Sequence, residues 1–192
     1  MKHQSFCTIL GLTTLTSIAA LSFSLSPGFS QETSAPNQSD KVTFMCRSIF
    51  DKASGKQIPA TIAWIPERRG HVRFIGWKSE YFEKSGWTTQ KRCEEVTKKF
   101  QAAYEQGRLE YLTTGQNNGY PIICTVNIHG NCNGSNQLFT LKDGSNSELV
   151  LQQLINVATG TSSEPLLQSS GGKKYFHVQN FLNNAPLLNI QR

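Results

Sequence analysis

Hydrophobic and polar positions alternate along three short segments in the first half of the chain, with turn sequences between them. The segments are residues 42–48 (VTFMCRS), 60–65 (ATIAWI) and 72–77 (VRFIGW). Such alternation is typical of strands that turn one face toward a core, and the short connections predict an antiparallel meander. Strict alternation in the third segment places Phe74 on the face opposite to Ile75 and Trp77.

Residues 88–107 show helical periodicity instead. Thr88 or Thr89 can cap the amino end, and Gly107 stands where a left-handed residue often ends a helix. Charged side chains cover the rest of the surface, so the pattern predicts a long amphipathic helix with its apolar stripe on a core rather than on a cofactor. The stripe consists of Cys93, Val96, Phe100, Ala103 and Tyr104.

The stretch LEYLTTGQNNGYPIIC, residues 109–124, sets small polar side chains between two β-rich runs. It is either a binding loop or the turn of a hairpin. Asn118 and Gly119 accept positive φ at low cost, and Pro121 is tolerated at the start of a strand. A phosphate-binding loop would end in Gly-Lys-Ser/Thr before a helix, which this stretch does not. We therefore predict a hairpin.

The pattern after the hairpin predicts one more strand at 137–142 and a second, shorter helix at 147–160. Residues 161–192 are expected to form a loosely packed tail. Within it, residues 174–181 (KYFHVQNF) predict an edge strand, and the charges of Lys173 and Lys174 would keep that edge from pairing with another chain. The predicted fold class is α+β: an antiparallel sheet of five to seven strands packed by one long and one shorter helix, within a domain at 42–160.

The first thirty residues differ from the rest. They have a basic start, an apolar stretch at 6–25 and small residues before Gln31, with no acidic residue before Glu32. This order is typical of a secretory signal peptide at 1–30. A retained membrane anchor is the alternative, because the run approaches the roughly 20 residues of a spanning helix. Residues 31–41 predict a flexible lead. We expect export to the periplasm, a thylakoid lumen or the exterior.

Cleavage leaves Cys46, Cys93, Cys124 and Cys132. An even number of cysteines in an exported chain predicts two disulfides, and the sequence alone permits three pairings. Loop closure favours Cys124–Cys132, eight residues apart across a turn, which leaves Cys46–Cys93. A zinc site of four thiolates is the alternative, but it usually shows C-x-x-C pairs, and the chain has none.

The positive charge is concentrated in one half of the mature chain. Residues 41–108 contain 14 Lys and Arg against 7 Asp and Glu, whereas 109–192 contain 4 of each. This asymmetry favours an anionic partner, either a membrane surface, a polysaccharide or an envelope protein, and export disfavours nucleic acid. The alternative is an ordinary solvated surface. The candidate binding surface interleaves cations and aromatic rings: Arg68, Arg69, His71, Arg73, Trp77, Lys78 and Trp87, with Tyr81 and Lys84 nearby.

The sequence contains little that points to catalysis. His71, His129 and His177 lack the spacing of a metal site on a helix, and oxidised cysteines offer no thiolate. We predict no catalytic residue, no metal and no cofactor, and hence a non-enzymatic binding domain. The alternative is an enzyme acting on cell-envelope material through the polar loop around Asn117 and Asn118.

Five sequence pieces occur in a recognisable order, from F-x-C (44–46) to LFTLK (138–142). Between them stand WKSEYF (77–82), GWTTQKRCEEVTKKFQ (86–101) and the stretch 109–124. Together they resemble the circadian oscillating protein family of cyanobacteria over roughly residues 42–157. The resemblance implies an exported protein held at a membrane periphery, with rhythmic abundance in the founding member. The four cysteines match the family's motif positions, but the resemblance implies no catalytic residue or ligand.

Overall fold

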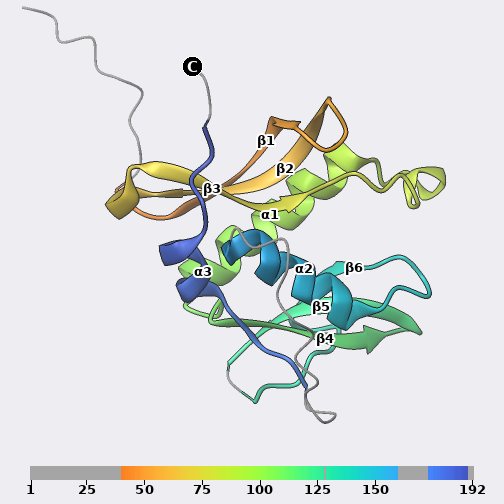
Figure 1. Cartoon of the computed structure of the whole chain (residues 1–192). Helices are drawn as coiled ribbons and strands as arrows, with labels where there is room; N and C mark the ends of the chain where they lie inside the picture. Colours follow the sequence, from red (N-terminus) through yellow and green to blue (C-terminus); the bar gives the residue numbers. More distant parts are fainter. Residues whose placement is uncertain (1–39, 128, 160–172, 190–192) are drawn as a thin grey trace, which may run out of the picture. The chain divides into compact units, whose positions relative to one another are not determined.

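The computed structural model describes residues 40–127, 129–159 and 173–189, which form two antiparallel sheets with helices between them (Figure 1). The predicted signal peptide lies outside the described residues, as do 160–172. No helix in the described ranges is long and apolar enough to cross a membrane. The α+β class predicted from the sequence is confirmed, but the seven strands divide into sheets of three and four instead of forming one sheet.

The first sheet is the predicted meander. Its strands are β1 (Thr43–Asp51), β2 (Lys56–Ile65) and β3 (Gly70–Gly76), paired in the order β1-β2-β3. The pairing of β2 with β3 shifts register between Thr61 and Ile62, so that an extra residue bulges out of β3. Phe74 and Ile75 are therefore both buried in the main core. The strict alternation predicted for this strand is wrong at that point.

Helix α1 (Thr89–Glu105) packs on this first sheet, as its periodicity predicts. The Thr88 hydroxyl accepts a hydrogen bond from the Lys91 N–H at 3.2 Å, which caps the amino end. Cys93 forms a disulfide with Cys46 of β1. The ring of Phe100 stacks on that of Phe44 at 5.6 Å. The helix is thus fixed to the sheet both covalently and by packing.

The second sheet has the order β6-β5-β4-β7. The predicted hairpin is confirmed as β4 (Tyr111–Asn117) and β5 (Tyr120–Val126), joined by Asn118 and Gly119 at φ 50° and 81°. Cys124 forms a disulfide with Cys132, whose loop covers the outer face of the sheet. A Cβ atom at Gly115 would lie 2.6 Å from the Cys132 carbonyl oxygen, so only glycine fits there. Both disulfides are the pairs favoured by loop closure.

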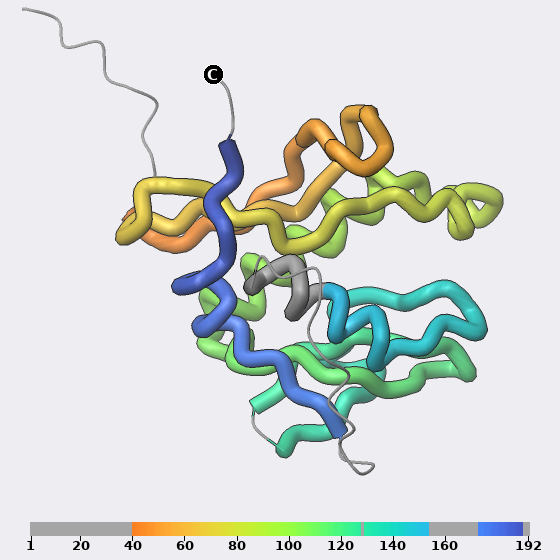
Figure 2. The backbone as a smooth tube through the Cα atoms, in the orientation of Figure 1, coloured from red at the N-terminus to blue at the C-terminus, as the bar shows by residue number. Residues whose placement is uncertain are grey.

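The remaining elements are β6 (Gln137–Thr140), α2 (Ser147–Thr159), β7 (Phe176–His177) and α3 (Val178–Asn184). The predicted edge strand is present only as the two residues of β7, because α3 starts at once. Figure 2 shows residues 173–189 running from the second sheet up to the first. Strand β7 pairs with β4, and Leu187 forms a bridge with Val72 of β3.

We call residues 173–189 the C-terminal strap. These residues do not form the loosely packed tail predicted from the sequence. The strap buries five apolar side chains in the main core: Phe176, Val178, Phe181, Leu182 and Ala185. Because each large side chain buried in this way contributes about 1.5–3 kcal/mol, the strap is an integral part of the domain.

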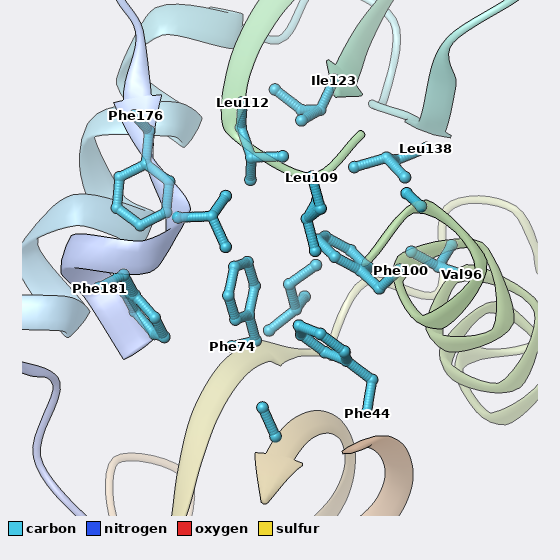
Figure 3. Packing of buried hydrophobic residues seen from close by; sticks show 14 of the residues in the cluster. Phe44, Phe74, Val96, Phe100, Leu109, Leu112, Ile123, Leu138, Phe176 and Phe181 are labelled. Carbon is cyan, nitrogen blue, oxygen red and sulfur yellow. The ribbon is translucent and has the colours of Figure 1, made fainter. Parts of the chain in front are cut away.

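One core fills the space between the two sheets (Figure 3). Phe74 lies near its centre, with its ring 4.9 Å from Phe100 of α1 and 4.5 Å from Phe181 of α3. Leu112 and Ile123 reach the same core from the second sheet. The bulge in β3 is what turns two consecutive side chains into this space.

Candidate binding groove

A cavity of about 650 Å³ opens between helix α1 and the second sheet. Its walls are the connection between β3 and α1 (residues 77–88), residues 92–99 of α1, the start of β5, and β6. Figure 1 shows that the 77–88 loop and the β4–β5 turn lie on the same side of the molecule. We call this cavity the groove. Its aromatic and charged lining residues are Tyr81, Phe82, Lys84, Trp87, Arg92, Glu95, Lys99, Tyr120 and Phe139.

Three aromatic side chains in the groove are nearly half exposed. Tyr81 is 46%, Trp87 43% and Tyr120 46% exposed, and each lines the cavity. Two of them belong to the 77–88 loop and the third to the start of β5. Large aromatic side chains usually bury most of their surface, so three such rings on one cavity form an open apolar platform of the kind found at binding sites.

Three cations share the groove with these rings. The Arg92 guanidinium lies 4.6 Å from the Phe82 ring centroid and 4.9 Å from that of Trp77, so its position is held by cation–π contacts. Partial burial lowers the pKa of Arg92, but arginine keeps its charge at neutral pH. Within the described ranges, the Lys84 and Lys99 side chains form no hydrogen bond or ion pair.

One carboxylate also lines the groove. Glu95 accepts a hydrogen bond from the ammonium of Lys98 at 2.7 Å, and this hydrogen bond lowers the pKa of Glu95. Two further lysines lie over aromatic rings at the edge: Lys91 over Trp87 at 4.8 Å and Lys142 over Tyr81 at 5.4 Å. The acid is therefore paired, and the groove presents a positive potential to a ligand.

A buried polar chain supports the floor of the groove. The Trp77 indole N–H donates to the Thr61 hydroxyl at 3.1 Å, and that hydroxyl lies 2.9 Å from the Thr97 hydroxyl. The Trp77 ring packs edge-on against Phe139 at 5.6 Å. Trp77 is only 4% exposed, so its assignment to an exposed binding surface is corrected: it belongs to the core beneath the groove.

Two cations of the predicted surface bind an acid elsewhere. Lys78 and Arg73 approach the Asp51 carboxylate at 2.5 Å and 3.8 Å. The hydrogen bonds from Lys78 and Ser54 lower the pKa of Asp51 to about 2. These charges connect the β1–β2 turn to β3 and its continuation, so they have a structural role away from the groove.

The other basic residues of that predicted surface are also separated from the groove. The Arg68 guanidinium donates to the Leu182 carbonyl of α3 at 2.8 Å, and Arg69, at φ 47°, ends the short helix after β2. The His71 ring lies 5.1 Å from Trp64, and burial and then Arg47 lower the pKa of His71. Of the seven predicted surface residues only Trp87 lines the groove, where the structure joins it to the neighbouring Tyr81 and Lys84.

Sequence reasoning missed the residues that reach the groove from distant parts of the chain. Arg92 and Lys99 have the spacing of an ordinary polar helix face, and Tyr120 and Phe139 that of strand residues. No motif connects them, because only the packing of the second sheet beside α1 brings them together. In the sequence, the only local indication of the groove was the concentration of aromatic and basic residues at 77–87.

Two polar side chains of the β4–β5 hairpin, those of Asn117 and Thr113, have partners within the fold. The Asn117 amide donates to the Gln137 side-chain oxygen at 2.9 Å, and the Thr113 hydroxyl donates to the Lys174 carbonyl at 2.7 Å. In the part of the chain that the structure describes, no group of three or more His, Cys, Asp or Glu side chains is placed to hold a metal ion. Asn117 and Thr113 thus contribute contacts that hold β6 and the strap.

Fold and groove together define a small, disulfide-bonded α+β domain of two antiparallel sheets. Residues 43–183 match the sequence model of the family described as Circadian oscillating protein COP23, and the chain belongs to this family. The match extends beyond the resemblance seen in the sequence and includes β7 and most of α3. Neither a curated protein nor a solved structure matches the chain.

Proposed function

We propose that this protein is a non-enzymatic binding domain that works outside the reducing cytosol and holds an anionic polymer of the cell envelope in the groove. The observation that carries the proposal is the convergence of three half-exposed aromatic rings and three cations on one cavity of about 650 Å³. Ligand sites typically measure about 300–1,000 Å³ and combine apolar walls with a few polar groups. The cations select negative charge, and the rings supply contact area.

Two features support an extracytoplasmic location. The first thirty residues have the order of a signal peptide, and the domain contains two disulfides. Disulfides persist in oxidising compartments and are rare where thioredoxin and glutathione keep thiols reduced. A ligand in the same compartment would be an envelope component rather than a cytosolic nucleic acid.

The test is co-sedimentation of the purified, disulfide-intact protein with an envelope fraction at low and high salt. Replacing Lys84 and Lys99 with Ala (K84A/K99A) should release the protein, because it removes the two groove lysines whose side chains form no hydrogen bond or ion pair within residues 40–127, 129–159 and 173–189. The matched control is K52A/K56A, which removes the same charge from the exposed β1–β2 turn. Equal release by both variants would mean that net charge, and not the groove, governs binding, and would refute the proposal.

Family membership supports a further expectation, namely that the abundance of the protein follows the daily cycle. It rests on the description of the family alone. Immunoblots of cells sampled through two day–night cycles, with cells that lack the protein as the specificity control for the antibody, would measure it. A constant level would contradict it without affecting the proposed binding.

A further inference from the structure

We infer that the ligand of the groove is an acidic polysaccharide built of carboxylated sugars. The inference rests on the proposed binding function and specifies its ligand. In this arrangement sugar rings lie on Tyr120 and on the faces of Trp87 and Tyr81 that Lys91 and Lys142 do not cover, and their carboxylates meet the ammonium groups of Lys84 and Lys99. Each part follows from a different property of the groove.

The aromatic rings favour a ligand with flat, partly apolar faces. A sugar ring has a face of C–H groups and an edge of hydroxyls, so it stacks on an aromatic side chain while its edge remains hydrated. Tyr81, Trp87 and Tyr120 are each nearly half exposed and line a hollow. A lipid chain would need a closed apolar cavity, whereas this groove is open and its lining includes three cations.

The placement of the cations favours a ligand that carries repeated charges. Lys84 comes from the 77–88 loop and Lys99 from α1, whereas the Arg92 guanidinium is occupied by two aromatic rings. A single small anion is usually bound by clustered arginines or backbone amides that converge on it. Two flexible lysines on separate walls instead suit carboxylates that are spaced along a polymer.

Polar groups on the β6 side provide partners for sugar hydroxyls. The Gln137 side chain accepts from the Asn117 amide at 2.9 Å and donates to the Thr140 hydroxyl at 2.8 Å, which fixes its orientation. Gln137 and Thr140 both line the groove, together with the aromatic residues Tyr120 and Phe139 of the same sheet. Oriented amide and hydroxyl groups beside aromatic rings match the hydroxyl edge and the apolar face of a sugar unit.

The fluorescence of Trp87 allows a direct test. Trp64 and Trp77 are 5% and 4% exposed, so Trp87, at 43%, is the tryptophan that a ligand can reach. The disulfide-intact protein would be titrated with polygalacturonate, with dextran as a neutral polysaccharide, with poly-glutamate as an acidic polymer without sugars, and with phosphatidylglycerol vesicles. We expect saturable quenching by polygalacturonate. The affinity for dextran, poly-glutamate and the vesicles should be about tenfold or more weaker, because each lacks either the stacking or the charge contribution.

Variants separate the contribution of the rings from that of the charges. Y81A/W87A should weaken polygalacturonate binding about tenfold or more, measured by calorimetry because the fluorophore is lost. The matched control is F50A, which removes a 58% exposed ring from the β1–β2 hairpin and should leave the affinity unchanged. W87F keeps a ring and should retain most of the affinity, which shows that a loss in Y81A/W87A reflects stacking and not misfolding.

The outcomes distinguish this inference from the proposed function. Equal binding of poly-glutamate and polygalacturonate, with Y81A/W87A unaffected, would overturn the sugar inference and leave an anion-binding groove. Binding of the vesicles alone would overturn it in favour of a lipid surface. If none of the polyanions binds, and K84A/K99A behaves as the unaltered protein with envelope material, the proposed function itself fails.

Discussion

The polar chain beneath the groove allows a quantitative prediction for T61V. Thr61 accepts the Trp77 indole N–H and contacts the Thr97 hydroxyl. All three residues are buried, and no buried side-chain nitrogen or oxygen among the described residues lacks a hydrogen-bond partner. Valine has nearly the shape of threonine, so T61V leaves little cavity but removes the one acceptor that the indole N–H has in the described part of the chain. T61V therefore creates an unsatisfied buried donor.

The expected loss follows from that unsatisfied group. A buried donor left without an acceptor costs about 1–3 kcal/mol, and the lost hydroxyl–hydroxyl bond adds about 0.5–1.5 kcal/mol. T97V loses only the second contribution, because Thr61 still accepts from Trp77 and a helical threonine position tolerates valine. We expect T61V to lower the free energy of unfolding by about 2–4 kcal/mol and T97V by about 1 kcal/mol, with the difference due to the orphaned indole.

Urea unfolding of the oxidised proteins, followed by far-ultraviolet circular dichroism, measures both values. A double-mutant cycle with W77F isolates the indole contribution, because T61V orphans no donor once the indole is absent. The coupling energy should be about 1–3 kcal/mol. If T61V is no more destabilising than T97V, or if T61V and W77F are additive within about 0.5 kcal/mol, the N–H to hydroxyl bond does not support the groove.

Three further predictions concern the parts that hold the domain together. C46S/C93S should lower the free energy of unfolding by about 4 kcal/mol in the chain-entropy model, because the bond joins residues 47 apart. This loss should exceed that caused by removing the Cys124–Cys132 disulfide, which closes a shorter loop, and urea midpoints measure both. The pKa of Asp51 is lowered to about 2 from 3.8, so its ion pairs stabilise the fold above about pH 4 and that contribution is lost as the pH falls toward 2. D51N should flatten the dependence of the urea midpoint on pH across this range, and an unchanged slope would contradict the assignment. G115A should displace the loop at Cys132, because its Cβ would lie 2.6 Å from that carbonyl oxygen, and thiol labelling of the unfolded protein should then detect incomplete oxidation.

Local signals in the sequence predicted most of the individual elements. The periodicity and capping of residues 88–107 predicted α1 within a residue or two, and Asn118-Gly119 predicted the β4–β5 turn. These signals are strong because each depends on residues within one turn of helix or one hairpin. The disulfide pairs also followed from chain separation. The division of the strands into two sheets could not be predicted, because sheet membership depends on pairing between strands that are distant in the sequence.

The groove was predicted only in part, and for the same reason. Trp87, Tyr81 and Lys84 lie in one loop that is visibly rich in aromatic and basic residues. Trp77 stands in the same run but is buried, because the bulge at Phe74 changes the phase of the strand before it. Tyr120 joins the site only through the packing of the second sheet, which no local pattern in the sequence describes.

The C-terminal strap determines when the domain can complete its folding. Its residues complete the edge of one sheet, bridge Val72 in the other and place Phe181 against Phe74 in the shared core. A chain that emerges amino end first, from a ribosome or from a translocation channel, therefore cannot finish folding until residues 173–189 have emerged. Until that moment both sheets expose apolar faces to chaperones and proteases. Folding therefore requires the strap, and a polypeptide cut short before residue 173 would be degraded instead of accumulating.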